Sequence, residues 1–437
     1  MSFLFSRRLK ISLSFFSCLA FFSSCASNSS GSQSLIESSS PALPAKSLSL
    51  SDKPTGYAEI KMPSKNGVTV KSREELLAAA ERGGLIIVNG TIDLSDGCLP
   101  KESGAGSPAL DDFVSKNSSF SSYEEFKSSY AKACTSSTND KSSSSAESSL
   151  GSTLWSLNKS YGDKIKLYLK SNTALIGKEG AVIKGGSIQI SGASNVVVRN
   201  ITIQDAYDPF PHHEKDDGFN AQWDNIAVTN GSKNIWIDHC TLEDTMTYSK
   251  VEISDGSHEK WQNYDGLCDI TKSSKNVVVS YCKFKNHDKT MLVGSGSSDI
   301  KGGFITIHHN VFLNCGQRLP MTCYQNMHIF NNCYERNSEA LYDQKASIAA
   351  RYGSYSIIAE NNYFGNGVSY CISASTKASG KCSESGNIFK SRSEKNKGLS
   401  TQEEKPFEPN YSYFPEDAEN LPDILAEYAG AGLFLSL

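Results

Sequence analysis

Five charged residues recur at a similar place in a repeated pattern near the middle of the sequence. Three are carboxylates and two are cations, in the order Asp224, Asp265, Asp269, Lys289 and Arg318. Carboxylate oxygens are the ligands that Ca²⁺ prefers, whereas ammonium and guanidinium groups form charge-assisted hydrogen bonds with carboxylates. Brought together, these side chains would place a site for a cation beside a site for an anionic group.

The elements that must position these residues are extended segments of a repeat. Each copy opens with alternating apolar residues, many of them β-branched, which is typical of strands and not of helices. The copies start at Val196, Ile235, Val277, Ile305, Met327 and Ser356. A strand repeat of this size predicts a solenoid whose coils stack about 4.8 Å apart. We therefore expect an all-β fold, a right-handed parallel β-helix.

One turn position supports this register. The sixth residue of each copy reads, in chain order, Ile201, Cys240, Cys282, Asn310, Asn332 and Asn361. Three successive asparagines predict an amide ladder, in which each side chain bonds to the next coil. The alternative is three unrelated turn residues, because turns favour asparagine.

Several motifs in this region resemble the signatures of the pectate lyases of polysaccharide lyase family 1. They are Trp236-Ile-Asp-His239, Asp265-Gly-Leu-Cys-Asp-Ile270, His287-Asp-Lys-Thr-Met-Leu-Val-Gly294, His308-His-Asn310 and Arg318-Leu-Pro320. Any one of them is a weak signal, but all of them in order, across roughly residues 66 to 435, are specific. The resemblance implies a calcium-dependent pectate lyase that cleaves polygalacturonate by β-elimination to unsaturated oligogalacturonates.

The resemblance also implies a role for each charged residue. The expected Ca²⁺ ligands are Asp224, Asp265 and Asp269, and the metal would act as a Lewis acid on the substrate carboxylate. Arg318 is the expected base and also contacts the substrate, Lys289 holds a substrate carboxylate beside it, and His287 is expected to bind substrate. A guanidinium ordinarily has a pKa above about 12, so an arginine base predicts an alkaline optimum. The alternative is that Arg318 only binds substrate and that water or hydroxide is the base.

The spacing of two carboxylates predicts a bend in the chain. A straight strand would hold Asp265 and Asp269 about 13 Å apart, too far to share one ion. Gly266 is the expected pivot, since glycine in a strand often marks a bend. Three carboxylates leave Ca²⁺ under-coordinated, so substrate and water would complete its shell.

The sequence departs from the family pattern at one position. The family usually has a further arginine two or three residues after Arg318-Leu-Pro320, and here Cys323 stands in that place. A contact to a substrate carboxylate is then lost. We expect either weaker binding or a substitute cation, for which Arg351 is the candidate.

Three alternative functions fit the sequence less well. A polygalacturonase on the same fold needs catalytic aspartates arranged for acid catalysis and water activation, and Lys289 and Arg318 disfavour it. A pectin lyase acts on esterified substrate and needs no calcium ligands. An inactive polysaccharide-binding β-helix protein is supported only by Cys323.

The beginning of the chain is typical of an exported bacterial protein. Basic residues and a short apolar run predict a signal peptide of the lipoprotein type over residues 1–24. Cys25 is the expected lipidation site; the alternative is an ordinary cleaved signal. Residues 25–55 are rich in serine and predict a tether. We expect a secreted protein, attached to the outer membrane or cell surface through its lipid.

The rest of the chain, residues 56–437, is expected to be one pectate lyase domain with an insertion at about residues 101–155. A helix is expected within this insertion, over Tyr123–Lys132. Before it, Ser72 and Glu75 form a capping box, which predicts a helix that covers the open end of the solenoid.

Charge and cysteine content bound the partners and the compartment. The net charge of −4 gives no basic surface for nucleic acid. We expect polygalacturonate as the partner, no nucleic acid, membrane contact only through the lipid, and a monomer. An exported protein permits disulfides, and the candidate pairs among the twelve cysteines are Cys98–Cys134, Cys240–Cys282 and Cys371–Cys382.

Overall fold

The computed structural model describes residues 47–437, except residues 65, 102–103, 136–149, 215–217, 248, 253–257, 297–298, 300–302, 324–325, 392–400, 403 and 437. These residues belong to one compact unit. The expected signal peptide, Cys25 and most of the expected tether lie outside them. Within the part of the chain that is described, no helix is both long and apolar enough to cross a bilayer.

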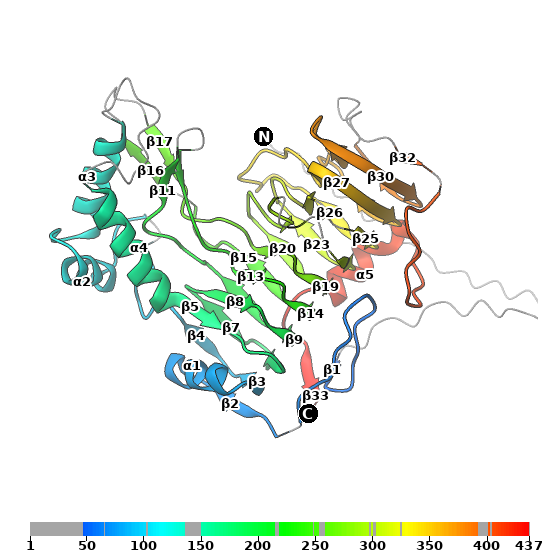
Figure 1. The fold of residues 1–437 in the computed structure, drawn as a ribbon, viewed down its shortest axis with the longest axis horizontal. Helices are drawn as coiled ribbons and strands as arrows, with labels where there is room; N and C mark the ends of the chain where they lie inside the picture. Colours follow the sequence, from blue (N-terminus) through cyan, green and yellow to red (C-terminus); the bar gives the residue numbers. More distant parts are fainter. Residues whose placement is uncertain are drawn as a thin grey trace, which may run out of the picture. The chain divides into compact units, whose positions relative to one another are not determined.

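Three parallel sheets run along the molecule, and successive coils add one strand to each (Figure 1). The front sheet contains β5 (Lys166–Tyr168), β8 (Ser187–Ser191), β13 (Ile226–Thr229), β18 (Cys268–Ile270), β21 (Leu292–Val293), β24 (Met321–Cys323), β27 (Ile348–Glu360) and β29 (Ile372–Ala374). The back sheet contains β2 (Val68–Val70), β3 (Gly84–Val88), β6 (Thr173–Gly177), β9 (Ser194–Arg199), β14 (Lys233–Asp238), β19 (Lys275–Ser280), β22 (Phe304–His308), β25 (Asn326–Phe330), the second part of β27, β30 (Ala378–Ser385) and β32 (Thr401–Gln402).

The side sheet contains β4 (Thr91–Asp93), β7 (Val182–Lys184), β10 (Thr202–Gln204), β15 (Thr241–Glu243), β20 (Lys283–Lys285), β23 (Val311–Leu313), β26 (Cys333–Glu335), β28 (Tyr363–Phe364) and β31 (Ile388–Phe389). Neighbouring strands in all three sheets pair in parallel. This arrangement confirms the predicted parallel β-helix.

The predicted register is confirmed for all copies of the repeat except the last. Successive first residues pair across the back sheet, from Val196 with Ile235 to Ile305 with Met327. In the last copy Met327 pairs with Ile357, one residue after the predicted Ser356. The apolar Ile357 is buried in the core, and this fixes the register.

The amide ladder is present, with one member corrected. Side-chain amides donate from Asn310 to Asn332 at 2.9 Å and from Asn332 to Asn362 at 3.0 Å. Asn362 donates in turn to Asn387 at 3.0 Å. The prediction of Asn361 was wrong by the same one-residue shift, and the ladder extends one coil further than predicted. Each bond satisfies a buried amide group, which would destabilise the turn if it had no partner.

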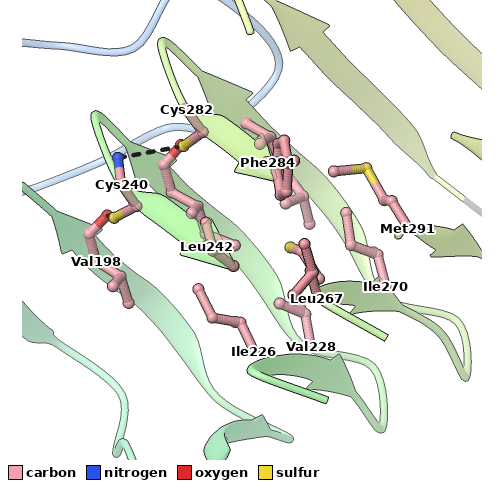
Figure 2. Packing of buried hydrophobic residues seen from close by; sticks show 14 of the residues in the cluster. Val198, Ile226, Val228, Cys240, Leu242, Leu267, Ile270, Cys282, Phe284 and Met291 are labelled. Carbon is pink, nitrogen blue, oxygen red and sulfur yellow. Dashed lines mark hydrogen bonds between the residues drawn. The ribbon is translucent and has the colours of Figure 1, made fainter. Parts of the chain in front are cut away.

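Apolar side chains from the three sheets fill the space between them. Figure 2 shows residues such as Val198, Ile226 and Leu242 pointing into this interior. Aromatic rings of the side sheet also stack from coil to coil, as Phe284 does on Phe312 with ring centroids 4.9 Å apart. Each buried Val, Leu or Ile contributes about 1.5–3 kcal/mol relative to exposure.

The predicted capping helix is α1 (Arg73–Arg82). Ser72 accepts a hydrogen bond from the backbone N–H of Glu75, as in a capping box, whereas the Glu75 carboxylate accepts one from the backbone N–H of Lys71, one residue before the N-cap. Gly83 ends the helix with φ of 72°, in the left-handed region that favours glycine. Leu76 packs into the main core, so α1 covers the first coil.

The expected insertion contains three helices, α2 (Pro108–Asn117), α3 (Tyr123–Thr135) and α4 (Gly151–Ile165). The helix predicted over Tyr123–Lys132 is confirmed, and α4 continues past the predicted end of the insertion. Their apolar faces build a second core with the segment that holds β11 (His212–Glu214), β12 (Gly218–Asn220), β16 (Ser249–Glu252) and β17 (His258–Trp261). Tyr123, Phe126 and Tyr130 of α3 are fully buried there, so the aromatic residues of this helix pack inside, whereas Trp155 of α4 is 53 % exposed.

The cysteines of the described chain are free thiols, and most of them are buried. Cys240 and Cys282 are neighbours at the ladder position, but the contact is a hydrogen bond from the Cys240 N–H to the Cys282 sulfur at 3.4 Å (Figure 2). None of the three candidate disulfides is therefore formed.

Candidate active site

The outer face of the front sheet carries the five charged residues singled out in the sequence. Asp269 lies within β18, where it pairs with Ala227 of β13. The other four, Asp224, Asp265, Lys289 and Arg318, lie in the segments that lead into β13, β18, β21 and β24. Lys289 pairs with Gln317 in an isolated parallel bridge, which places Arg318 one coil after Lys289. The solenoid thus brings all five onto consecutive coils of one face.

Gly266 allows two carboxylates to converge. Its backbone N–H donates to Asp224 Oδ1 at 2.8 Å. A Cβ at this position would lie 2.6 Å from Asp224 Oδ1 and 2.6 Å from Asp269 Oδ1, so the two oxygens are at most about 5 Å apart. β18 begins only at Cys268, and Asp265 precedes it outside the strand. The predicted departure from a straight strand is therefore present.

Burial and mutual repulsion act on this pair. Burial raises the pKa of Asp224 well above its ordinary value, and the charges of Asp269 and Asp265 raise it further. The pKa of Asp269 is raised to about 7 by burial and by Asp265, although Arg318 lowers it. These two carboxylates thus lack the positive charge needed to balance them.

Asp265 has a different partner from the other two carboxylates. Its Oδ1 forms an ion pair with Lys289 Nζ at 2.7 Å. The same ammonium donates to Asn220 Oδ1 at 2.7 Å. Lys289 is only 6 % exposed, so the ion pair is shielded from solvent.

His287 is buried next to Asp265, and its expected contact with substrate stays a prediction. It is 2 % exposed. Nδ1 lies 2.7 Å from Asp244 Oδ2, and Nε2 lies 2.8 Å from the backbone oxygen of Asp265. With both nitrogens engaged, His287 positions the Asp265 backbone.

Arg318 has an unusual backbone and an unpaired side-chain nitrogen. Its φ is 61°, and no other arginine in the described chain has φ in the left-handed region. Its Nε is buried without a hydrogen-bond partner. Strain of this kind is often stored at functional sites, and a buried unpaired N–H is a group that a ligand can satisfy.

The position at which the family has a further arginine is buried here and holds Cys323. Cys323 is fully buried in β24 and pairs with Tyr352 of β27. The pairing shifts between Thr322 and Cys323, which leaves Arg351 as the extra residue of a bulge. Arg351 is exposed. A bulge often redirects a side chain next to an active site, so the substitute cation suggested by the sequence is available to solvent beside β24.

No pattern in the sequence indicates Asn220 or Asp244, which contact Lys289 and His287. Each belongs to a segment remote from its partner in the sequence and to no motif. A carboxylate or amide near a buried histidine or lysine is recognisable only after the coils are stacked.

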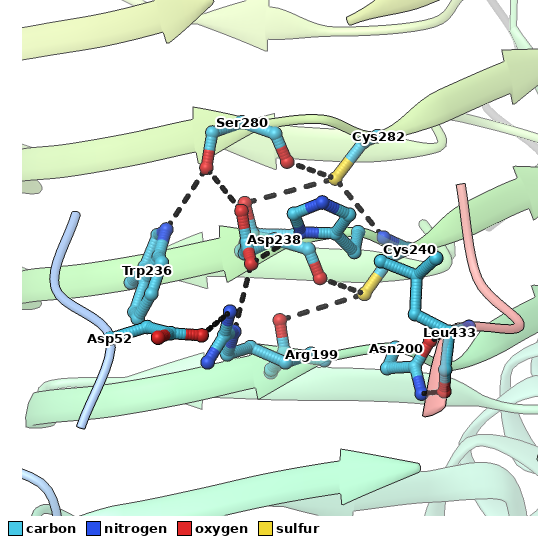
Figure 3. A network of polar contacts seen from close by, with 12 residues as sticks. Asp52, Arg199, Asn200, Trp236, Asp238, Cys240, Ser280, Cys282 and Leu433 are labelled. Carbon is cyan, nitrogen blue, oxygen red and sulfur yellow. Dashed lines mark hydrogen bonds and ion pairs between the residues drawn. The ribbon is translucent and has the colours of Figure 1, made fainter. Parts of the chain in front are cut away.

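The prominent motif Trp236-Ile-Asp-His239 belongs to a separate network on the back sheet (Figure 3). Asp238 Oδ2 lies 2.8 Å from Arg199 Nε and 2.6 Å from His239 Nδ1. Asp52 also contacts Arg199, at 3.2 Å. Asp238 and His239 are therefore held by contacts within the protein.

The acidic site has carboxylate donors for a hard cation, but the third carboxylate, Asp265, is paired with Lys289. Within the described residues, no three His, Cys, Asp or Glu side chains are grouped around one point as a metal site requires. Asp224 and Asp269 face each other, whereas Asp265 is paired with Lys289. The chemistry of the donor set fits Ca²⁺, provided that Asp265 exchanges its partner.

Comparison with known proteins gives consistent matches. The sequence profile described as pectate lyase matches residues 103–433. Pectate lyase E from Dickeya chrysanthemi is 37 % identical over 211 residues, which cover 46 % of this chain and 52 % of the relative. Pectate lyase from Bacillus subtilis (strain 168) is 35 % identical over 187 residues, 40 % of this chain and 43 % of the relative. The chain spans about half the length of the curated relatives it matches.

Solved structures agree over a longer part of the chain. The pectate lyase from Acidovorax avenae subsp citrulli has a TM-score of 0.74 at 23 % identity and covers 92 % of this chain and 99 % of that one. A pectate lyase bound to hexasaccharide has a TM-score of 0.68 at 26 % identity and covers 85 % and 93 %. The first of these supports the fold alone.

Proposed function

We propose, on the premise that this chain belongs to the pectate lyase family, that it is a calcium-dependent lyase that cleaves polygalacturonate by β-elimination. One observation carries the proposal: the carboxylates of Asp224 and Asp269 converge on Gly266, on the face that also carries Lys289 and Arg318. A site for a divalent cation then adjoins two cationic side chains. This combination suits a polymer that has a carboxylate on every sugar.

In the proposed reaction, Arg318 removes the proton from C5 of a galacturonate residue. The electron pair of that C–H bond forms a double bond between C5 and C4, the bond from C4 to the glycosidic oxygen breaks, and this oxygen takes up a proton from water. Arg318 suits a contact with the reacting atoms because its Nε is buried and unpaired. The arginine base requires an alkaline medium, since a guanidinium ordinarily keeps its proton.

Asp224, Asp269 and Asp265 would hold Ca²⁺. Bound there, Ca²⁺ supplies positive charge that stabilises the developing charge on the substrate carboxylate. The raised pKa values of Asp224 and Asp269 support this assignment, because a cation would relieve their repulsion. Release of Asp265 from Lys289 would free the ammonium to bind a substrate carboxylate.

The test is incubation of the protein with polygalacturonate at alkaline pH, with Ca²⁺ and then with a chelator. We expect ultraviolet absorbance of the unsaturated product that depends on Ca²⁺. New reducing ends without this absorbance would identify a hydrolase instead. Binding of the polymer without any cleavage would identify the inactive binding protein, and restoring arginine at Cys323 would then be the next variant.

Export and lipidation at Cys25 are a second, separate proposal, which rests on the sequence of residues 1–25. Radiolabelled palmitate incorporated into the expressed protein, and lost in Cys25→Ala, would support it. Processing without lipid would favour an ordinary signal peptide.

The proposed monomer is a separate point. A single sedimenting species with the mass of one chain would support it.

A further inference from the structure

The front sheet continues past the acidic site toward the beginning of the solenoid, and its outer face stays open there. Tyr168 of β5 pairs with Gln189 of β8, Gln189 pairs with Ala227 of β13, and Ala227 pairs with Asp269 of β18. One line of outward residues therefore runs from Tyr168 to Asp269. Three strand spacings separate them, about 14 Å.

The direction of these side chains follows from their neighbours. Leu167, Ile188 and Val228 alternate with them and are fully buried in the main core. Because side chains in a strand point to opposite faces in turn, Tyr168 and Gln189 point outward. Tyr168 is 52 % exposed, so its ring is available to a ligand on this face.

A cation comes from the same strand as Tyr168, although its ammonium lies over Trp223. Lys166 is two residues earlier on the same strand and on the same face, and its ammonium lies 5.5 Å from the ring centroid of Trp223. Burial lowers the pKa of Lys166, whereas the more distant charges of Asp163 and Asp208 act to raise it. Gln189 donates to Ser187 Oγ at 2.7 Å through its Nε2, and its carbonyl oxygen can accept from a hydroxyl group.

Ala227 leaves room between this group and the acidic site. Its side chain is a single methyl, so a chain lying along the sheet meets no bulky residue on this line between Gln189 and Asp269. A single exposed aromatic residue needs no explanation by itself. An aromatic face and an amide in register with Asp269, with an ammonium from the neighbouring line of the same sheet, together form a surface that complements a uronic acid.

We infer that Tyr168, Gln189 and Lys166 form a distal subsite for an uncleaved galacturonate residue of the chain that occupies the acidic site. The inference rests on the proposed function and adds a determinant of chain length to it. Tyr168 offers its ring to the apolar face of the sugar, Gln189 binds a hydroxyl group, and Lys166 binds the carboxylate. Short oligomers that fill only the acidic site do not reach these side chains.

The test compares short and long substrates in Tyr168→Ala. We expect KM for polygalacturonate to rise about fivefold, the equivalent of one modest aromatic contact, with kcat unchanged and with trigalacturonate kinetics unchanged. Phe434→Ala is the matched control, because Phe434 is 63 % exposed on β33 (Phe434–Ser436), which pairs with β1 (Ser47–Ser49) away from the front sheet. Tyr168→Phe keeps the ring and should restore the polymer KM.

Calorimetry separates this inference from the proposed reaction. Binding of long oligogalacturonates to Arg318→Ala, with Ca²⁺ present, should weaken about fivefold when Tyr168→Ala is added. Loss of this effect, or an equal effect on trigalacturonate, overturns the subsite. A wild-type protein that binds through Tyr168 but releases no unsaturated product would overturn the lyase and leave the subsite standing.

Discussion

Two clusters of buried charged residues on this solenoid differ in how their charges are compensated. On the back sheet, burial alone would raise the pKa of Asp238, but His239, Arg199 and Ser280 together hold it well below its ordinary value. On the front sheet, burial and like charges raise the pKa of Asp224 and Asp269. The first cluster is complete in the protein alone, and the second lacks a cation.

The difference separates structural from functional polar groups. The back-sheet cluster ties the segment at Asp52 to the coils through Arg199, and Trp236 lies against the same guanidinium, 4.2 Å from its ring centroid (Figure 3). A satisfied buried network makes the fold rigid and specific. Without a bound cation, the front-sheet carboxylates destabilise the protein. Groups with such shifted pKa values are common at functional sites.

The largest effect expected is the loss of activity in Arg318→Ala. Removal of the base should lower kcat about a thousandfold. The free energy of unfolding should change little, because Arg318 Nε has no hydrogen-bond partner to lose and only the charge interaction with Asp269 is removed. The measurement is absorbance of the unsaturated product together with thermal unfolding. Arg82→Ala, at an exposed position of α1, is the control. Retained activity would assign proton removal to water or hydroxide.

Asp238→Ala should lower stability and leave catalysis unchanged, the reverse of Arg318→Ala. It leaves Arg199 buried without its carboxylate, and loss of one partner of a buried pair should lower the free energy of unfolding by about 3 kcal/mol. Denaturant unfolding measures this, and kcat should be unchanged in the folded protein. Asp52→Ala removes the exposed partner of the same arginine and should cost less than about 1 kcal/mol. Equal costs in the two variants would contradict the assigned difference in burial.

Calcium should complete the front-sheet cluster and stabilise the protein. At a Ca²⁺ concentration 100 times Kd, the free energy of unfolding should rise by about 2.7 kcal/mol, and a chelator should reverse the gain. Asp269→Asn should lose most of this response. Asp238→Ala should keep it, since the back-sheet cluster needs no metal. An unfolding temperature of the wild-type protein that does not change when Ca²⁺ is added would contradict the proposed metal site.

The sequence predicted the fold better than it predicted the contacts within the site. Alternating apolar residues specify strands and their register because they must face the core, and only the Ser356 copy was misplaced. The identities of Asp224, Lys289 and Arg318 came from resemblance and from equivalent places in the repeat.

The remaining contacts depend on side-chain conformation and on insertions. Asn220 belongs to the β11–β12 hairpin, outside the three sheets of the solenoid, and accepts a hydrogen bond from Lys289. No periodic pattern links the two residues. His287 belongs to a signature, yet the signature does not reveal that the residue is buried. The candidate disulfide between Cys240 and Cys282 failed for a related reason, because sharing a ladder position places two cysteines near each other without fixing the direction of their sulfurs.

Gly266→Ala should weaken the metal site while it spares the fold. The new methyl group would lie 2.6 Å from oxygens of Asp224 and Asp269, and these side chains can move where backbone could not. We expect Ca²⁺ affinity to fall about tenfold, about 1.4 kcal/mol, in calorimetry without substrate. Gly296→Ala is the matched control, since its methyl would meet no atom closer than 3.8 Å. Unchanged affinity in Gly266→Ala would show that the two carboxylates do not share an ion.

The smallest expected effect is a pH dependence that comes from the back sheet. Burial would raise the pKa of Glu360, but hydrogen bonds from His328, Tyr413 and Lys405 lower it from 4.5 to about 2. A carboxylate whose pKa is lower in the folded state stabilises the protein fully above pH 4.5. This contribution is lost as the pH falls from 4.5 toward 2, because the unfolded chain then binds the proton more readily.

Between roughly pH 5 and pH 3, the loss should be on the order of 1 kcal/mol. Glu360→Gln keeps the side-chain shape and should flatten this part of the stability curve, as measured by urea unfolding at each pH. Protonation of His328 acts in the same direction at higher pH, because burial lowers its pKa below 6.5, so the comparison must be made below that range. An unchanged slope in Glu360→Gln would mean that the back-sheet carboxylate is not stabilised by its partners, and the contrast with the front sheet would then rest on Asp238 alone.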